Sequence, residues 1–184
     1  MADPKRGLVG RSAVLGQIRL AVRQVAGGTG QAMLVTGEAG IGKTRLVAEG
    51  LDDARRRGVQ VFRGAAEELE RRRPFGAIAD CLGIGGSPPD GRRAAITRLL
   101  AEDSGGIDGD WFGDTPQAEF RVVEAVVALV EELSARSPVM LAVEDLQWAD
   151  PSTLLVLQRL GRRVGQLPVL LVCTARPVPR SQEL

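Results

Sequence analysis

Short apolar runs alternate along the chain with longer segments in which apolar residues recur every three or four positions. A short apolar run between turn residues is typical of a buried strand, and the longer period is typical of a helix with one buried face. The predicted buried strands are residues 33–35, 59–62, 139–143 and 169–173. Because strands that alternate with helices form parallel sheets with right-handed crossovers, the pattern predicts a layered α/β domain.

The predicted helices differ in how clearly their buried faces are marked. One long helix is predicted at residues 115–135, with Phe120 on its buried face. The helix between the last two strands is expected to place Leu154 inward. The pattern weakens across residues 83–115, where we expect an insert or a mobile region with a short helix at 92–100.

Composition places the chain among soluble globular domains. With 184 residues, a hydrophobic content of 44% and a charged content of 26%, residues 1–184 suit a single domain. The 24 basic and 23 acidic residues leave a net charge of +1, so direct DNA binding by this segment is not expected. No run approaches 18 apolar residues and the start lacks a hydrophobic signal core, so we expect a cytoplasmic protein without membrane contact.

Residue types that are missing or rare narrow the possible chemistry. The chain has no histidine, which excludes a Ser-His-Asp triad and most zinc sites. Cys81 and Cys173 lie in apolar stretches without metal-like spacing, so both are predicted to be reduced core residues. Any catalysis must therefore rely on carboxylates, Lys, Arg, Thr and a metal ion.

A phosphate-binding loop is predicted at residues 37–44, directly after the first strand and before a helix. The segment has the pattern G-x-x-x-x-G-K-S/T, and strand, loop and helix follow in the order that this motif requires. Its glycines let backbone N–H groups turn toward phosphate oxygens, Lys43 reaches the outer phosphates, and the Thr44 hydroxyl ligates Mg²⁺. The residues of the loop are Gly37, Glu38, Ala39, Gly40, Ile41, Gly42, Lys43 and Thr44.

The use of lysine strengthens this interpretation. The basic residues number 24, yet the lysines among them are Lys5 and Lys43. A compact ammonium suits a phosphate cradle better than a planar guanidinium. The alternative is a glycine turn that precedes a lysine by chance.

Polar residues at the ends of the last two strands supply a candidate second half of the site. Glu144 and Asp145 follow one apolar run, and Thr174 and Arg176 follow the next. Open parallel sheets gather ligand groups at the carboxyl ends of their strands. An acid there can hold the water shell of Mg²⁺, and an arginine there can contact a terminal phosphate. The alternatives are ordinary turn residues and an arginine that turns toward solvent.

Four segments together resemble the STAND class of signal-transduction ATPases, and more narrowly the ATPase module of large bacterial LuxR-type transcriptional regulators. They are LVGR from Leu8, GEAGIGKT followed by Arg45, VEDLQWADPST from Val143, and the strand end TAR at Arg176. The resemblance implies a P-loop NTPase with a three-layer α/β sandwich and strand order 2-3-4-1. It also leads us to expect a fifth strand and a lid domain, which this sequence lacks, so the core is expected to be truncated at its C-terminal end.

The resemblance also implies roles for individual residues, with ATP or ADP and Mg²⁺ as the ligands. Glu144 takes the place of the Mg²⁺-supporting acid, Asp145 that of the water-activating acid, and Arg176 that of the phosphate sensor. The leader, Val9, Gly10 and Arg11, corresponds to the segment beside the adenine, and Arg45 extends the loop. Many relatives have Asp before Glu, whereas this chain has Glu before Asp, which favours slow hydrolysis.

These observations support three functional hypotheses. The first is an ATP-binding, slowly hydrolysing switch in a multidomain transcriptional regulator, which would contact DNA through a C-terminal domain absent from this sequence. The second is a phosphotransferase acting on a small molecule, and the third is a scaffold with a vestigial nucleotide site. Without a fifth strand, the strand before the loop lies at an exposed sheet edge, so we also expect self-association.

Overall fold

The computed structural model describes residues 12–86, 91–103 and 116–177. Within them lies a four-stranded sheet of β1 (Gln31–Thr36), β4 (Val169–Ala175), β3 (Val139–Glu144) and β2 (Gln60–Ala65), in that spatial order. All three strand pairs are parallel. The order β1-β4-β3-β2 is the predicted 2-3-4-1 order read from the other edge, so the predicted topology is confirmed.

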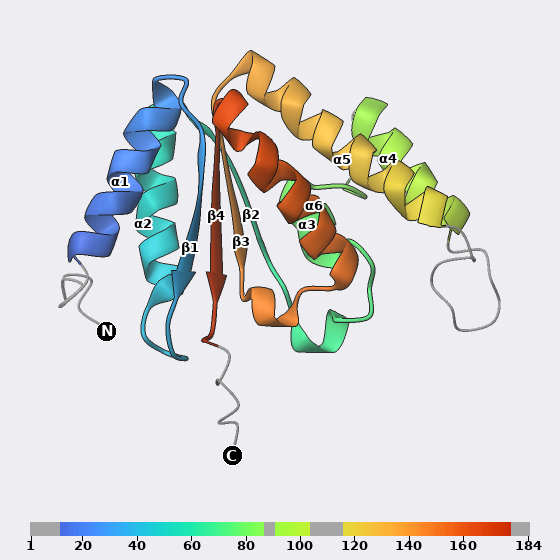
Figure 1. Ribbon diagram of the computed structural model, residues 1–184, viewed down its shortest axis with the longest axis horizontal. Helices are drawn as coiled ribbons and strands as arrows, with labels where there is room; N and C mark the ends of the chain where they lie inside the picture. Colours follow the sequence, from blue (N-terminus) through green and yellow to red (C-terminus); the bar gives the residue numbers. More distant parts are fainter. Residues whose placement is uncertain (1–11, 87–90, 104–115, 178–184) are drawn as a thin grey trace.

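Helices cover both faces of the sheet and form the expected three layers (Figure 1). On one face lie α1 (Ser12–Ala26) and α2 (Lys43–Arg56), and on the other lie α3 (Gly76–Leu82), α5 (Pro116–Arg136) and α6 (Pro151–Arg163). Helix α4 (Gly91–Asp103) packs against α5. Short 3₁₀ turns are η1 (Glu68–Glu70), η2 (Leu146–Trp148) and η3 (Val164–Gln166).

Strand β3 is buried along its whole length, which explains its unbroken apolar sequence. Its alternate side chains enter two separate cores. Val139, Leu141 and Val143 pack with α3, α5 and α6, whereas Met140 and Ala142 pack with α1 and α2. The strand therefore holds the two outer layers together and fixes where its carboxyl end points.

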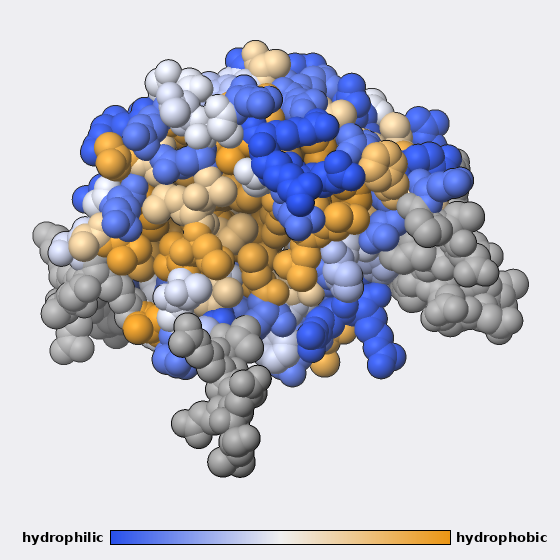
Figure 2. Space-filling model, viewed as in Figure 1, coloured by the Kyte–Doolittle hydropathy of each residue, from blue (hydrophilic) through white to orange (hydrophobic). Residues whose placement is uncertain are grey.

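Strand β1 differs from the prediction that it is buried. It lies at the edge of the described sheet, as expected from the family's topology without a fifth strand. Among its residues only Val35 is buried, while Leu34 is 61% exposed. Figure 2, which views the molecule as in Figure 1, shows apolar surface across the middle of this face. The apolar run was read correctly as a strand, but an apolar run alone does not distinguish an edge strand from a central one.

Two predicted core positions are also wrong. Phe120 is 48% exposed and Leu154 is 43% exposed. Phe120 lies at the margin of the contact between α5 and α6, where the Arg159 guanidinium covers its ring at 5.4 Å. Leu154 lies outside the buried stripe of α6, which includes Val156 and Leu160. The weakly patterned region includes α4, whose helix is longer than the predicted 92–100.

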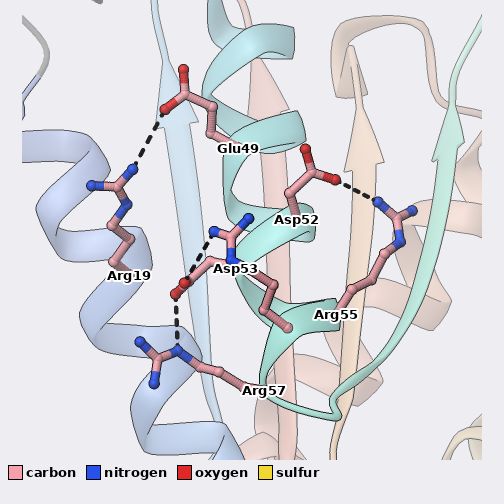
Figure 3. A network of polar contacts seen from close by, with 7 residues as sticks. Arg19, Glu49, Asp52, Asp53, Arg55 and Arg57 are labelled. Atoms are coloured by element: carbon pink, nitrogen blue, oxygen red, sulfur yellow. Dashed lines mark hydrogen bonds and ion pairs between the residues drawn. The ribbon is translucent and has the colours of Figure 1, made fainter.

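Ion pairs fasten the end of α2 and join it to α1 (Figure 3). Arg19 of α1 lies 3.7 Å from Glu49 of α2. Asp53 accepts hydrogen bonds from Arg57 at 3.1 Å and Arg56 at 3.3 Å. Burial alone would raise the pKa of Asp53, but these two arginines lower it below its usual value. The arginine run at the end of α2 therefore has a structural explanation, and the helix that follows the predicted loop is held firmly.

The two cysteines are free and buried, as predicted. Burial in the apolar core raises the pKa of Cys81 and of Cys173 to about 12. Both thiols are therefore protonated and unreactive in the folded chain near neutral pH. Among the helices of the described residues, none is long and apolar enough to cross a membrane.

Candidate functional site

The loop after β1 has the backbone that its glycines predict. Gly40 has φ 73° and Gly42 has φ 91°, in the left-handed region that side chains disfavour. Gly42 stands at the start of α2 and has no side chain to cap the first helical N–H groups. These N–H groups and the positive end of the helix dipole are therefore available to an anion. The loop begins at Gly37, whose N–H donates to the Ala175 carbonyl of β4 at 3.2 Å.

Lys43 lies inside the loop rather than in solvent. Its side chain curls back so that Nζ donates to the carbonyl oxygens of Gly37, at 2.7 Å, and Glu38, at 3.1 Å. The residue is only 8% exposed. An ammonium has three N–H donors. Two of them bind the loop carbonyls and hold Nζ in place, and the third remains for a ligand. The loop thus carries a fixed positive charge at its centre.

A cavity of about 230 Å³ brings the two halves of the predicted site together. Its lining includes residues of the loop and residues from the carboxyl ends of β3 and β4. These are Ala39, Gly40, Gly42, Lys43, Thr44, Asp145 and Arg176. Pockets for whole drug-sized ligands measure about 300–1,000 Å³. The cavity therefore has the size and the donors for the phosphate end of a nucleotide.

A chain of hydrogen bonds joins Asp145 to Arg176. Asp145 follows β3 with a left-handed φ of 57°, and its N–H donates to the Thr174 hydroxyl at 3.0 Å. Gln147 Nε2 donates to Asp145 Oδ1 at 3.1 Å, and the Arg176 N–H donates to Gln147 Oε1 at 3.0 Å. Gln147 thus uses both ends of its amide to connect two strand ends. Sequence reasoning assigned it no role, although an amide directly after an acidic pair was the available signal.

Trp148 lies between two guanidinium groups. The Arg176 guanidinium carbon is 6.0 Å from the centre of its ring, and that of Arg71 is 5.8 Å from the centre. The ring also packs against the core on the α3, α5 and α6 side of the sheet. Arg176 therefore lines the cavity with its side chain resting on an aromatic surface.

Glu144 is buried and faces a partner that the sequence did not indicate. It is 2% exposed and does not appear among the residues that line the cavity. Its Oε1 accepts a hydrogen bond from Arg63 Nε of β2 at 2.7 Å. A charged residue inside the apolar β2 segment was the signal that could have pointed to this pair.

The remaining predicted residues have varied positions. Thr44 lines the cavity beside Lys43, whereas Arg45 is directed away and lies 3.5 Å from Glu49. Val9, Gly10 and Arg11 fall outside the described residues. No cluster of three or more acidic or cysteine side chains in the described part of the chain could hold a metal by itself. The donor set fits Mg²⁺, which keeps several waters and is commonly bound by few protein groups together with phosphates.

A protein family and a longer bacterial protein are similar to this chain in sequence. The family described as "AAA ATPase domain" matches residues 7–172. An uncharacterized protein of Rhizobium meliloti (strain 1021), R02095, is 28% identical, and the match covers 87% of this chain but 18% of that protein. The chain therefore spans about a fifth of this curated relative.

Solved structures show a similar fold at low sequence identity. A chain in the structure of Drosophila ORC bound to DNA has a TM-score of 0.51 and 17% identity, covering 92% of this chain and 38% of that one. C. elegans PCH-2 gives a TM-score of 0.45 and 13% identity over the same shares. The parallel sheet, its strand order and the loop after β1 make this an α/β P-loop NTPase fold. The chain belongs to the AAA ATPase domain family.

Proposed function

We propose that the chain is the ATP-binding, slowly hydrolysing switch module of a multidomain bacterial transcriptional regulator of the LuxR type. The observation that carries the nucleotide part of this proposal is the cavity shared by the loop, Asp145 and Arg176. A loop alone would bind phosphate, but an acid and an arginine in the same cavity also allow the site to distinguish a nucleotide with a terminal phosphate from one without it. The regulatory part rests on the resemblance of four sequence segments to that class.

The loop supplies most of the binding. Backbone N–H groups at the start of α2 donate to phosphate oxygens, and Lys43 contributes its remaining donor while Gly37 and Glu38 hold it. Thr44 offers a hydroxyl to Mg²⁺. Glu144 does not line the cavity but directly precedes Asp145, which does, and by the family resemblance it supports the metal through the water shell. When bound, Mg²⁺ neutralises phosphate charge and orients the terminal phosphate.

The part of the site that contains Asp145, Gln147 and Arg176, called the acid half, discriminates between ATP and ADP. Asp145 orients the attacking water, and Gln147 fixes the direction of its carboxylate. Asp has one methylene fewer than Glu and reaches the water less well, so hydrolysis is slow. Arg176 contacts the terminal phosphate of ATP and loses that contact in ADP, which provides the differential affinity that a switch requires.

Signal output requires parts outside this segment. The net charge of +1 gives no field for holding DNA, and the match covers only 18% of the longer relative. We assign DNA contact to a separate C-terminal domain of the parent protein. A phosphotransferase would also need a binding site for a second substrate, for which the residues lining the cavity offer no further polar groups beyond the loop, Asp145 and Arg176.

Titration of nucleotide into the wild type and Lys43→Ala tests this function. Hydrogen bonds to a charged group contribute about 1.5–3 kcal/mol, so Lys43→Ala should bind MgATP roughly ten- to hundredfold more weakly. Arg23→Ala is the control, because Arg23 lies exposed on α1 away from the cavity. Equal affinity of wild type and Lys43→Ala, or no binding by either, would remove the proposed site and favour the scaffold hypothesis.

We also infer that the chain self-associates through β1. Within the described residues β1 pairs with β4 alone, so its other side presents backbone donors and acceptors, and Leu34 adds exposed apolar surface. A lysine on an edge strand disfavours pairing with another strand. Leu34→Lys should therefore shift the sedimentation coefficient toward the monomer, and a wild-type chain that is already monomeric would contradict the inference.

A further inference from the structure

The ion pair between Arg63 and Glu144 places a second positive charge behind the proposed nucleotide site. Arg63 Nε and Glu144 Oε1 are 2.7 Å apart, and the Glu144 side chain is 3% exposed while that of Arg63 is 45% exposed. A buried carboxylate without a cation would be strongly unfavourable. Arg63 therefore neutralises Glu144.

The strand register explains why these residues meet on the side of the sheet that carries the loop helix. β2 and β3 are parallel neighbours in which Arg63 lies beside Ala142 and Ala65 lies beside Glu144. Side chains two residues apart on a strand share a face. Ala142 faces α1 and α2, so Glu144, two residues later, faces that side too. On β2, Val61 packs against the same core, and Arg63, two residues after Val61, therefore faces the same side.

This position matters because Glu144 is the acid proposed to support Mg²⁺. Either a metal with its water shell or Arg63 can balance its charge. If neither is present, Glu144 and the neighbouring Asp145 present two negative charges near the phosphates of an incoming nucleotide. The repulsion would then oppose binding of a nucleotide that arrives without its metal.

We propose that Arg63 is a resident counter-cation of Glu144 that lets the site accept nucleotide before Mg²⁺ and so sets how strongly nucleotide binding depends on the metal. This inference rests on the proposed nucleotide site and assigns a positioning residue to it. Arg63 acts through Glu144 rather than by contact with the phosphates. Its removal should weaken metal-free binding much more than metal-loaded binding.

The expected size follows from the charge that is removed. One unit charge acting across a single binding site, in surroundings of effective dielectric about 20, changes affinity by about tenfold or more. Arg63→Gln should therefore weaken the binding of ATP in EDTA by about tenfold or more. With saturating Mg²⁺ the metal supplies the missing charge, so the affinity for MgATP should change by less than about threefold.

Calorimetric titration of the whole chain gives the dissociation constant of ATP with EDTA and that of ATP with excess Mg²⁺. The quantity compared between variants is the first constant divided by the second. Arg63→Gln should raise this ratio about tenfold, and Arg63→Lys, which keeps the charge, should leave it near the wild-type value. Glu144→Gln should lower the ratio through loss of metal support alone, so the inference is decided by the Arg63 variants. If Arg63→Gln does not fold, Arg63→Met, which keeps most of the side-chain length without the charge, should raise the ratio in the same way.

The outcomes separate this inference from the proposed function. If the wild type binds nucleotide but the ratio stays constant when Arg63 loses its charge, Arg63 and Glu144 form a structural ion pair only and the inference is wrong. Equal weakening of both forms of nucleotide by Arg63→Gln would contradict the inference as well. If the wild type binds neither form, the nucleotide site itself is wrong, and the inference falls with it.

Discussion

The two halves of the candidate site are built in different ways. In the loop half, Lys43 reaches carbonyl groups only five and six residues earlier in the chain. In the acid half, the bonds from Asp145 to Thr174 and from Arg176 to Gln147 each span 29 residues, and the bond from Arg63 to Glu144 spans 81. The loop is therefore defined by local sequence, whereas the acid half exists only when β2, β3 and β4 lie side by side.

This difference predicts a division of labour. Changes in the loop should reduce the binding of every nucleotide, because the N–H groups and Lys43 act on phosphates that ATP and ADP share. Changes in the acid half should alter hydrolysis, metal dependence or the preference for ATP, with smaller effects on overall affinity. The two halves should therefore be separable by properties that only one of them controls.

Among changes that keep every phosphate-contacting side chain, the largest effect is expected from Gly42→Ala in the loop half. Gly42 has φ 91°, and a side chain in the left-handed region costs about 1–2 kcal/mol. Nucleotide affinity should fall about tenfold, for ATP and ADP alike, because the strain reorients the first N–H groups of α2. Binding measured by titration, together with chemical denaturation, checks both effects.

The matched control for this change is Gly16→Ala. Gly16 lies in the middle of α1, and a methyl group there would meet nothing within 4 Å. Alanine in a helix interior is about 0.5–1 kcal/mol more favourable than glycine. The control should therefore be more stable and bind nucleotide as the wild type does. A Gly42→Ala variant that binds normally would show that the loop backbone is not the binding element.

An intermediate effect is expected from Gln147→Ala in the acid half. The substitution removes the bond that directs the Asp145 carboxylate and the bond to the Arg176 backbone. A misplaced catalytic group slows chemistry, so the steady-state ATPase rate should fall about fivefold to tenfold while MgATP affinity changes less than about threefold. Gln158→Ala, on the exposed side of α6, serves as the control. A variant that loses affinity and rate equally would contradict the separation of the halves.

The smallest effect is expected in the environment of Trp148. Arg176 rests on this ring, and an exposed contact of this kind contributes only about 0.5–1 kcal/mol. A terminal phosphate should therefore draw Arg176 away from the ring. In a Trp111→Phe background, Trp148 fluorescence should change with MgATP and not with MgADP, and Arg176→Ala should abolish the difference. Identical responses to both nucleotides would place Arg176 outside the sensing of the terminal phosphate.

The sequence was sufficient for the features that local pattern determines. The loop with Lys43 was readable because strand, glycines and helix are contiguous, and the fully buried β3 was readable because both of its faces are apolar. The pair Asp150-Pro151 is a local signal of the same kind, since it is typical of a helix start, and Asp150 accepts a hydrogen bond from the Thr153 N–H at 2.8 Å. These features need no knowledge of which strands are neighbours.

The features that the sequence missed depend on neighbours in the sheet. The partnership of Arg63 with Glu144 follows from the pairing of β2 with β3, which no local pattern reveals. The edge position of β1 was expected from the family's topology, but the exposure of Leu34 was not indicated by its apolar run. The contact of Arg176 with Trp148 depends on the turn that carries Trp148. The exposure of Phe120 depends in the same way on how α5 meets α6, where Arg159 and not the core covers its ring.

The most direct test of the account is the ratio of the dissociation constants for MgADP and MgATP, measured in the wild type and in Arg176→Ala. A guanidinium contact to the terminal phosphate contributes about 1.5–3 kcal/mol. The account predicts that the wild type prefers MgATP by about tenfold or more and that Arg176→Ala binds both nucleotides with similar affinity. A wild type that binds both equally, or an Arg176→Ala variant that keeps the full preference, would contradict it.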